Sequence, residues 1–420
     1  MSNNIITRTI DGVMGWVNDR APALAPMYRK HMSEYYAPKN FNIWYIFGVL
    51  SMVVLVNQVV TGIFLTMHFK PSAAEAFASV EYIMRDVDGG WLIRYMHSTG
   101  ASLFFIVVYL HMFRGLMYGS YQKPRELVWI LGMFIYLALM AEAFMGYVLP
   151  WGQMSFWGAK VIISLFGAIP VIGNGLTEWI MGDYLPSDAT LNRFFALHVI
   201  AVPLVLLLLV VLHLGALHEV GSNNPDGVEI KKGPKGNRWS PTAPADGVPF
   251  HPYYTVKDGF YVCALLVVGA FIIFFAPAFG GWFLEHDNFT EANKLVTPEH
   301  IKPVWYYTPY YAMLRVVPDK LGGVLVMFGA IAILFLVPWL DRAKVKSYRY
   351  RGLLSKLLLA TFALSFLWLG KIGAGPGTDP VETIVGRVLT LYYFLFFLTM
   401  PLWTKLDKTK PVPERVTTHD

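Results

Sequence analysis

Long apolar stretches alternate with polar connections along this chain. A helix needs about 20 consecutive apolar residues to cross a bilayer, and eight stretches reach or approach that length. They lie at about 42–68, 94–118, 126–149, 192–218, 257–279, 321–340, 352–371 and 381–403. The pattern therefore predicts an all-α, polytopic membrane protein with eight transmembrane helices. An even number of spans places both termini on one side of the membrane.

The distribution of charge predicts the orientation. Lysine and arginine gather in alternate connections, which the positive-inside rule identifies as cytoplasmic. The basic segments are 1–41, the connection between the second and third spans, 341–351 and 404–420, whereas the connection 69–90 is acidic. Both termini are therefore expected in the cytoplasm. Because topology explains the net charge of +6, we expect no nucleic acid as a partner.

Composition limits the chemistry. Charged residues make up 15% of the 420 residues, against about 25% in soluble proteins, and hydrophobic types reach 55%. The one cysteine, Cys263, excludes a disulfide scaffold, a Cys-x-x-Cys metal or redox pair and a covalent Cys-x-x-Cys-His haem attachment. Any metal is therefore expected to be held by histidine or carboxylate side chains.

Three segments outside the spans have a helical pattern of their own. Segment 1–41 predicts an amphipathic helix on the membrane surface, from the spacing of Ile5, Ile6, Ile10, Val13, Met14 and Val17. Connections 150–191 and 280–320, both on the outer face, contain apolar helical stretches. Long structured connections are usually functional, so we expect their surface helices to cover a site on that face.

Four of the eleven histidines lie within spans: His97 and His111 in the second, His198 and His213 in the fourth. A step of 14 residues makes almost four helical turns and rises about 21 Å, so His97 and His111 share a face near opposite membrane surfaces. The 15-residue step of the fourth span also returns to broadly one face. Both spans run in the same direction. His97 is therefore level with His198 near the outer face, and His111 with His213 near the inner face.

Each level pair can supply two axial imidazoles to one planar metal cofactor, and bis-histidine haem fits this geometry. Hydrogen-bonded core histidines and a proton relay are the alternatives, but neither requires depth-matched pairs. Glycines repeat a 14-residue interval in the first and third spans, at Gly48, Gly62, Gly132 and Gly146. Such glycines serve either close helix packing or clearance for two flat macrocycles. The pattern predicts a dihaem four-helix bundle formed by the first four spans.

Three arginines lie within five residues of these histidines: Arg94, Arg114 and Arg193. A forked guanidinium suits a carboxylate, so one interpretation is that they pair with haem propionates. Snorkelling to the membrane surface is the other. The sequence alone favours neither.

Several motifs then resemble, in order, the signatures of cytochrome b of the respiratory cytochrome bc complex. They are RYMHSTGASLFFIVVYLHMFRGLMYGSY, GYVLPWGQMSFWGA, RFFALHVIAVP, LHEVGSNNP, FHPYYTVKD, HIKPVWYY and RVVPDKLGGVL. The resemblance covers roughly residues 30–400 and is of the bacterial type. It implies a multi-pass protein of the bacterial inner membrane, in a complex that is a homodimer with bound lipid.

The resemblance implies a quinol–cytochrome c oxidoreductase subunit working by a Q cycle. Quinol is oxidised near the outer face, and one electron passes through a Rieske iron–sulfur protein to cytochrome c1. The other crosses two non-covalent b-type haems to reduce quinone near the inner face, contributing to a proton gradient. By the same resemblance, His97 and His198 ligate the low-potential haem iron, and His111 and His213 the high-potential one.

The two quinone sites are also implied by matching motif positions. The outer quinol site comprises Phe144, Gly146, Tyr147, Ile162, Pro303, Trp305 and Tyr306, and the inner quinone site His218, Ser222, Asn223, Lys257 and Asp258. Without the resemblance, His218 is an interfacial histidine. Lys257 and Asp258 are then the solvated start of a helix.

The chain departs from the family at two points. The interval between His198 and His213 is 15 residues, where most members have 14. Val304 stands where the family usually carries the glutamate of a Pro-Glu-Trp-Tyr turn, which is thought to accept a quinol proton. Glu142 is our candidate replacement, because a carboxylate in an apolar span is costly unless used. The alternative is that it hydrogen-bonds neighbouring backbone or faces the Rieske protein; Glu291 and Glu299 are secondary candidates.

On this interpretation the chain has five regions. They are a surface segment (1–41), a haem-binding four-helix bundle (42–218), a cytoplasmic connection (219–256), a C-terminal four-helix region with the outer quinol-site connection (257–403) and a tail (404–420). Two other classes of membrane protein are alternatives. A transporter with His and Glu proton relays would predict internal repeats and broken helices, and a dihaem dehydrogenase anchor would need only one quinone site.

Overall fold

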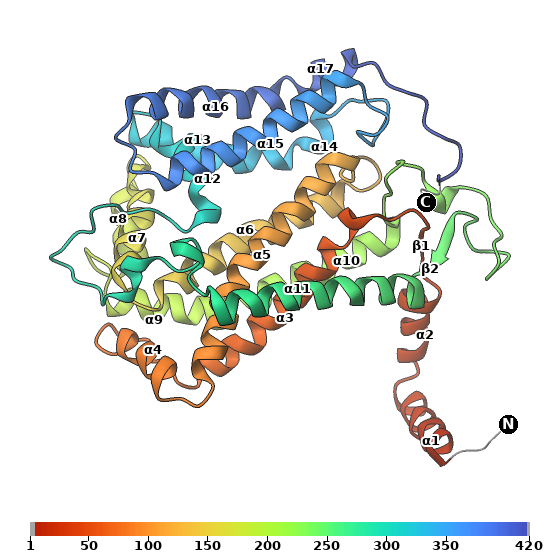
Figure 1. Ribbon diagram of the computed structural model, residues 1–420, viewed down its shortest axis with the longest axis horizontal. Helices are drawn as coiled ribbons and strands as arrows, with labels where there is room; N and C mark the ends of the chain where they lie inside the picture. The colour runs from red at the N-terminus through yellow and green to blue at the C-terminus, as the bar shows by residue number, and fades with distance from the viewer. Residues whose placement is uncertain (1–4, 418–420) are drawn as a thin grey trace.

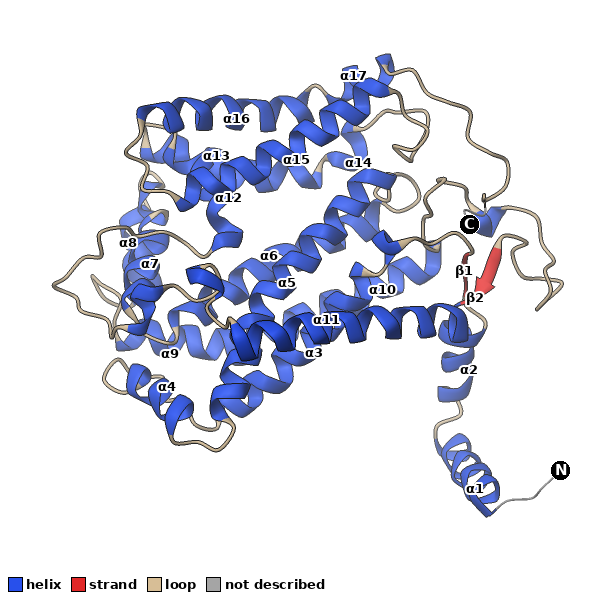
Figure 2. Ribbon diagram, in the orientation of Figure 1, coloured by secondary structure: helices blue, strands red, loops and turns tan. Residues whose placement is uncertain are grey.

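The computed structural model describes residues 5–417, and helices dominate it (Figure 2). In that part of the chain the regular β-structure is one antiparallel pair, β1 (Tyr36–Pro38) with β2 (Gly247–Pro249), in which Ala37 lies opposite Val248. Residues 1–4 and 418–420 of the predicted terminal regions lie outside the described residues, as do the side chains of Ile5 and Ile6.

Seven helical stretches within residues 5–417 are long and apolar enough to cross a membrane. Their helices are α3 (Phe47–Thr66), α5 (Gly90–Tyr118), α6 (Glu126–Val148), α9 (Asp188–Ala196) continuing into α10 (Val202–Val220), α11 (Thr255–Phe275), α15 (Leu353–Ala374) and α16 (Pro380–Leu398). Each coincides with a predicted span, so the multi-pass helical architecture is confirmed.

The predicted span 321–340 is interrupted. It forms the apolar helix α13 (Lys320–Phe335) and, after Leu336, the short helix α14 (Val337–Leu340). Pro338 explains the break, because proline has no N–H to donate and its ring clashes with the preceding turn. A count of eight spans therefore stays a prediction.

The helices of the first four spans pack in two pairs, α3 on α5 and α6 on α10. In Figure 1, α5 and α6 cross the centre of the molecule, while α3 and α11 run below them. The C-terminal helices α12 (Thr308–Arg315), α13, α15 and α16 form a separate layer above. The first four spans thus lie together, with the C-terminal helices against one side.

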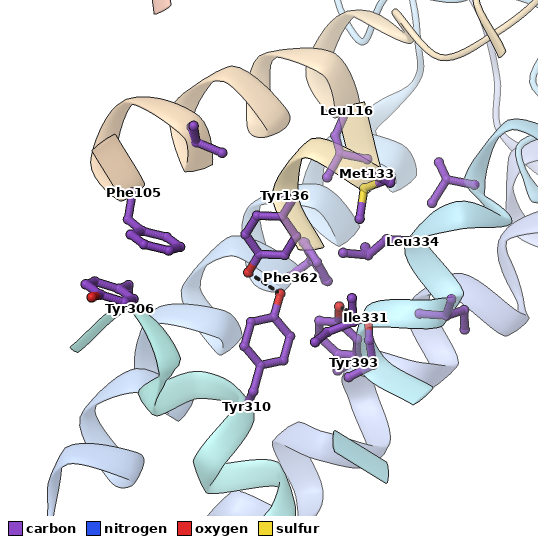
Figure 3. Packing of buried hydrophobic residues seen from close by; sticks show 14 of the residues in the cluster. Phe105, Leu116, Met133, Tyr136, Tyr306, Tyr310, Ile331, Leu334, Phe362 and Tyr393 are labelled. Atoms are coloured by element: carbon purple, nitrogen blue, oxygen red, sulfur yellow. Dashed lines mark hydrogen bonds between the residues drawn. The ribbon is translucent and has the colours of Figure 1, made fainter. Parts of the chain in front are cut away.

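One apolar core joins the two halves of the chain. Figure 3 shows Tyr136 of α6 donating to the hydroxyl of Tyr310 on α12, at 3.2 Å. Around this pair pack Phe362 of α15, Tyr393 of α16 and Ile331 of α13. This buried contact fixes the C-terminal layer, and the turn that precedes α12, against the bundle of the first four spans.

The two long connections on the predicted outer side form one assembly. The first contains α7 (Gln153–Ser164) and α8 (Gly173–Met181), and the second passes beside them. Gln153 N–H donates to the Thr290 carbonyl at 2.9 Å, and Ser155 N–H to Asn288 Oδ1 at 2.8 Å. The remaining connection before α5 carries α4 (Ala76–Arg85).

At the other end of the bundle the termini meet a polar connection. Asp246 is paired with Lys39 at 3.0 Å and with Arg415 at 2.7 Å. Beyond this, α1 (Ile5–Arg20) and α2 (Leu24–Tyr28) extend away from the bundle (Figure 1), and Ile10, Val13 and Met14 of α1 are exposed. The helix is as predicted, and its place on a membrane surface stays a prediction. The chain ends with α17 (Met400–Leu406) and an extended tail.

Candidate functional site

Two histidine pairs occupy the centre of the bundle, each joining α5 to the fourth span. The ring centroids of His97 and His198 are 6.2 Å apart, and those of His111 and His213 are 6.4 Å apart. The pairing is the one that helix periodicity and parallel direction predict. The structure therefore contains two similar sites stacked along the bundle.

The spacing within each pair suits a metal between two imidazoles. Metal–nitrogen bonds to histidine are about 2 Å long and a ring nitrogen lies about 1 Å from its centroid, so two axial rings place their centroids about 6 Å apart. Residues 5–417 contain no group of three or more His, Cys, Asp or Glu side chains that could hold a metal ion. Two imidazoles alone leave most coordination positions to another ligand, which a planar macrocycle provides.

Hydrogen bonds orient the His97–His198 pair. His97 Nδ1 lies 2.9 Å from Thr61 Oγ1, and His198 Nδ1 lies 2.9 Å from the Glu142 carbonyl oxygen. Histidines that bind metals usually donate their second ring N–H in this way. Nε2 of both rings makes no hydrogen bond within the described chain, which leaves it available as the ligand atom.

Each of the four glycines faces one of the four histidines. A Cβ on Gly48 would lie 3.3 Å from His111 Cε1, one on Gly62 3.4 Å from His97 Cε1, and one on Gly132 3.3 Å from His213 Cε1. A Cβ on Gly146 would lie 2.9 Å from His198 Nδ1, closer than real Cβ contacts. The glycines thus let each histidine ring lie against the facing helix, where a larger side chain would crowd it.

A π-helical turn absorbs the long interval between His198 and His213. Leu197–Ala201 forms this turn, with His198 inside it and Pro203 two residues beyond its end. A π turn accommodates one extra residue relative to an α-helix. The 15-residue step therefore behaves as a 14-residue step, which keeps His213 level with His111.

The three arginines differ in their surroundings. Arg114 lies over the Tyr45 ring at 4.8 Å and within 3.4 Å of His111 Nδ1, and its Nε is buried without a partner among the described residues. Arg193 is exposed and donates to the Trp179 carbonyl, and Arg94 is half-buried. A buried, incompletely paired guanidinium beside His111 fits a propionate-binding role best at Arg114.

At the His97–His198 end, the Pro303–Tyr306 turn is anchored to the bundle. Trp305 Nε1 donates to Ser102 Oγ at 3.1 Å, and the Tyr306 ring stacks on Phe105 at 3.8 Å. Val304 is buried. Of the other outer-site residues, Phe144 contacts the Phe194 ring at 5.6 Å, and Ile162 lies half-buried on α7.

The sequence analysis missed a buried carboxylate at this end. Glu285, only 6% exposed, accepts a hydrogen bond from the Tyr147 hydroxyl. Burial raises the pKa of Glu285 to about 7, although the Tyr147 hydrogen bond and Lys302 oppose the rise. In the sequence, the one hint was its position beside the apolar residues Phe283 and Leu284. The structure therefore adds a carboxyl group that titrates near neutral pH.

At the opposite end, His218 lies in an open pocket of about 370 Å³. Its Nδ1 is 2.9 Å from Nδ1 of His31, its ring stacks on Tyr35 at 4.4 Å, and the Tyr35 hydroxyl is 3.4 Å from Ser222 Oγ. His31 and Tyr35 come from the N-terminal segment, which the sequence analysis assigned to anchoring. They supply further polar groups to this site.

Lys257 and Asp258 line a second, smaller pocket of about 40 Å³. Lys257 Nζ donates to the Phe41 carbonyl at 2.9 Å. Of the predicted inner-site residues, His218 lines the larger pocket and Lys257 and Asp258 line the smaller one, whereas Ser222 and Asn223 line neither. Asn223 is buried, and its Nδ2 donates to the Tyr118 carbonyl at 2.7 Å.

Comparisons with known proteins agree with this geometry. Family models described as cytochrome b/b6/petB and cytochrome b(C-terminal)/b6/petD match residues 32–221 and 291–394. Cytochrome b of Allochromatium vinosum is 60% identical over 408 residues, covering 96% of this chain and 98% of that protein. Cytochrome b of Rickettsia bellii is 47% identical over 418 residues, covering 99% and 100%. A chain of a hyperthermophilic respiratory complex III superposes with a TM-score of 0.85 at 38% identity, covering 93% and 98%.

Proposed function

This chain belongs to the cytochrome b family, and from that premise we propose that it is the dihaem, quinol-oxidising subunit of a respiratory cytochrome bc complex. The family implies haem b and electron transport in a membrane complex. The observation that carries the proposal is the pair of sites in which two imidazoles lie 6.2 and 6.4 Å apart, each imidazole beside a glycine.

His97 and His198 would hold one haem, and His111 and His213 the other. The haems supply one-electron transfer along the bundle. Thr61 and Glu142 would orient His97 and His198 by contacting the Nδ1 atom of each ring. Clearance for the two haems would come from the four glycines that face the histidines, which are Gly48, Gly62, Gly132 and Gly146. Arg114 would pair with a propionate near His111, and Arg94 and Arg193 are further propionate candidates.

The outer quinol site would lie where the Pro303–Tyr306 turn meets α6 and α7. Trp305 and Tyr306 fix this turn to α5, and Phe144, Gly146, Tyr147 and Ile162 would complete the wall. Glu142 is the sequence-based candidate for taking a quinol proton. Its Oε1 lies 3.0 Å from His198 Nδ1 and its Oε2 is buried without a partner within residues 5–417. That role stays a prediction.

The inner quinone site would use His218 in the larger pocket and Lys257 and Asp258 in the smaller one, with Ser222 and Asn223 following His218 in the chain. A histidine and an acid can both deliver protons to a reduced quinone near neutral pH. Tyr35 joins the two pockets, because it stacks on His218 and contacts Phe250, which lines the smaller pocket, at 6.2 Å. A quinone headgroup in the larger pocket would contact His218 and His31.

The chain would work as one subunit of a larger complex. Electrons from outer quinol would leave to a Rieske iron–sulfur protein and then cytochrome c1, and the complex would be a lipid-bound homodimer. Eight spans with both termini in the cytoplasm, in a bacterial inner membrane, match the charge distribution. Outward proton release and inward uptake would then build the proton gradient of a Q cycle.

The test is to purify the complex and compare His97→Asn, His111→Asn and the control His68→Asn, whose side chain is exposed. Loss of one ligand should remove about half of the b-type absorbance in reduced-minus-oxidised spectra. Quinol–cytochrome c reductase activity should fall to background in both ligand variants. A wild-type complex without b-type bands would refute the proposal, as would full absorbance in both ligand variants.

A further inference from the structure

Glu285 occupies the position where quinol oxidation needs a base. Its carboxylate is buried at the end of α6, where it accepts the Tyr147 hydroxyl hydrogen bond. Tyr147 is itself fixed, since Ser155 Oγ donates to its carbonyl oxygen at 2.6 Å. The second carboxylate oxygen, Oε1, makes no hydrogen bond with any described residue. Oε2 of Glu285 is therefore held by a hydrogen bond, and Oε1 is available to accept a proton.

Glu285 also lies beside the turn that lacks a carboxylate. It is within electrostatic range of Lys302 and Tyr306, which flank Val304 on its two sides. Valine cannot accept a proton, and Val304 is buried. A carboxylate supplied by the preceding segment therefore reaches the place that the turn itself leaves without a base.

Solvent lies one residue away from the buried carboxylate. His286 and Asp287, which follow Glu285, are exposed. A proton taken up at Glu285 can therefore leave on the side of the molecule formed by the two long connections. Glu142 has no such route, because its Oε1 contacts His198 and its Oε2 is buried.

The geometry points to Glu285 as the catalytic base of the outer quinol site, an assignment that rests on the proposed function. One quinol O–H bond breaks and its proton passes to Glu285 Oε1, forming a carboxylic acid that later loses the proton to the outer solvent. The quinol loses two electrons, one to the iron–sulfur protein and one to haem b. The second hydroxyl proton leaves with the electron that the iron–sulfur protein accepts.

The pH dependence follows from the groups that face Glu285. They are Tyr147 of α6, Tyr306 and Lys302 of the turn segment, and Asp287 of its own segment. Burial holds the pKa of this carboxyl at about 7. Below that pH the acid form cannot accept a proton, so the quinol-oxidation rate falls as the pH decreases through neutrality.

The experiment measures quinol–cytochrome c reductase activity of the assembled complex from about pH 5.5 to about pH 9. Glu285→Gln should lower the rate roughly 100-fold and abolish the acidic limb. Glu285→Asp should keep the limb at a lower rate. Glu178→Gln, which changes an exposed carboxylate on α8, should match wild type, and Glu142→Gln should keep the limb near pH 7. Val304→Glu added to Glu285→Gln should recover at least about 10-fold of the loss.

Two results would overturn the assignment: an unchanged rate and limb in Glu285→Gln, or a lower rate with the wild-type limb retained, which marks a structural role. If Glu285→Gln does not assemble, Glu285→Asp decides: a lower rate with the acidic limb retained supports the assignment, and a rate equal to wild type overturns it. Failure of the proposed function is distinct, because it appears in the wild-type complex as missing b-type absorbance or missing quinol oxidation.

Discussion

The carboxylate of Glu142 lies 3.0 Å, through Oε1, from Nδ1 of His198, and the Glu142 carbonyl oxygen lies 2.9 Å from the same nitrogen. One residue of α6 therefore meets this histidine with both backbone and side chain. Carboxylates placed behind a ligand histidine orient the ring and raise its basicity as a ligand. This contact bears directly on the redox properties of the site.

Replacing Glu142 by Gln should raise the midpoint potential of the haem held by His97 and His198. A negative charge near the ligand stabilises the oxidised, more positive iron, and its removal should raise the potential by tens of millivolts. Potentiometric titration of the b-type bands measures the shift. Glu178→Gln, an exposed glutamate on α8, is the control, and equal potentials in both variants would contradict the prediction.

Replacing Gly132 by Val should reduce haem content by about half. A Cβ added at this position would already lie 3.3 Å from His213 Cε1. The two methyl groups of the valine would then crowd the region beside the histidine ring. Haem per chain, measured from the reduced spectrum, checks this. Gly215→Val is the matched control, because a Cβ there meets nothing within 4 Å; similar losses in both variants would count against a haem-clearance role.

Helical periodicity made much of the bundle predictable. The four histidines of the bundle pair as expected, because the intervals between them and the direction of their spans determine the depth at which each lies in the membrane. They are His97, His111, His198 and His213. The π turn at Leu197–Ala201 could not be foreseen. The 15-residue interval shows that one residue is added between the two histidines, but it does not show at which position of the helix. Glu285 was missed for a different reason: its contact with Tyr147 joins the end of α6 to a connection whose packing has no periodic signal.

The break after α13 was missed although its cause is in the sequence. The residues around Pro338 are all apolar, so a count of apolar residues extends the span to residue 340. The proline nevertheless ends the helical hydrogen-bonding pattern before residue 338. The inner site shows a similar limit. His31 reaches His218 from an N-terminal segment 187 residues away in the chain, and its helical pattern suggested only anchoring.

Replacing Arg351 by Ala should destabilise the chain by about 3–5 kcal/mol. Arg351 and Asp341 are fully buried, with Arg351 Nη2 donating to Asp341 Oδ2 at 2.5 Å and the Tyr121 hydroxyl donating to the same oxygen at 2.5 Å. Removing the guanidinium leaves a buried carboxylate without its ion-pair partner. Thermal denaturation of the purified complex measures the loss. Lys70→Ala breaks an exposed pair with Glu75 and should leave the denaturation temperature almost unchanged, because solvent screens exposed ion pairs; equal effects would refute the prediction.

Replacing Glu285 by Gln should stabilise the complex at alkaline pH. Folding raises the pKa of this carboxyl from 4.5 to about 7, so between these values the folded state retains a proton that the unfolded state releases. Stability therefore falls as pH rises through this window, by up to about 3 kcal/mol at 1.36 kcal/mol per unit. Glutamine carries no such penalty. Between about pH 5 and about pH 8 the denaturation temperature should fall less in Glu285→Gln than in wild type or the exposed-site variant Glu178→Gln, whereas parallel curves for all three would show that the carboxyl carries no burial penalty.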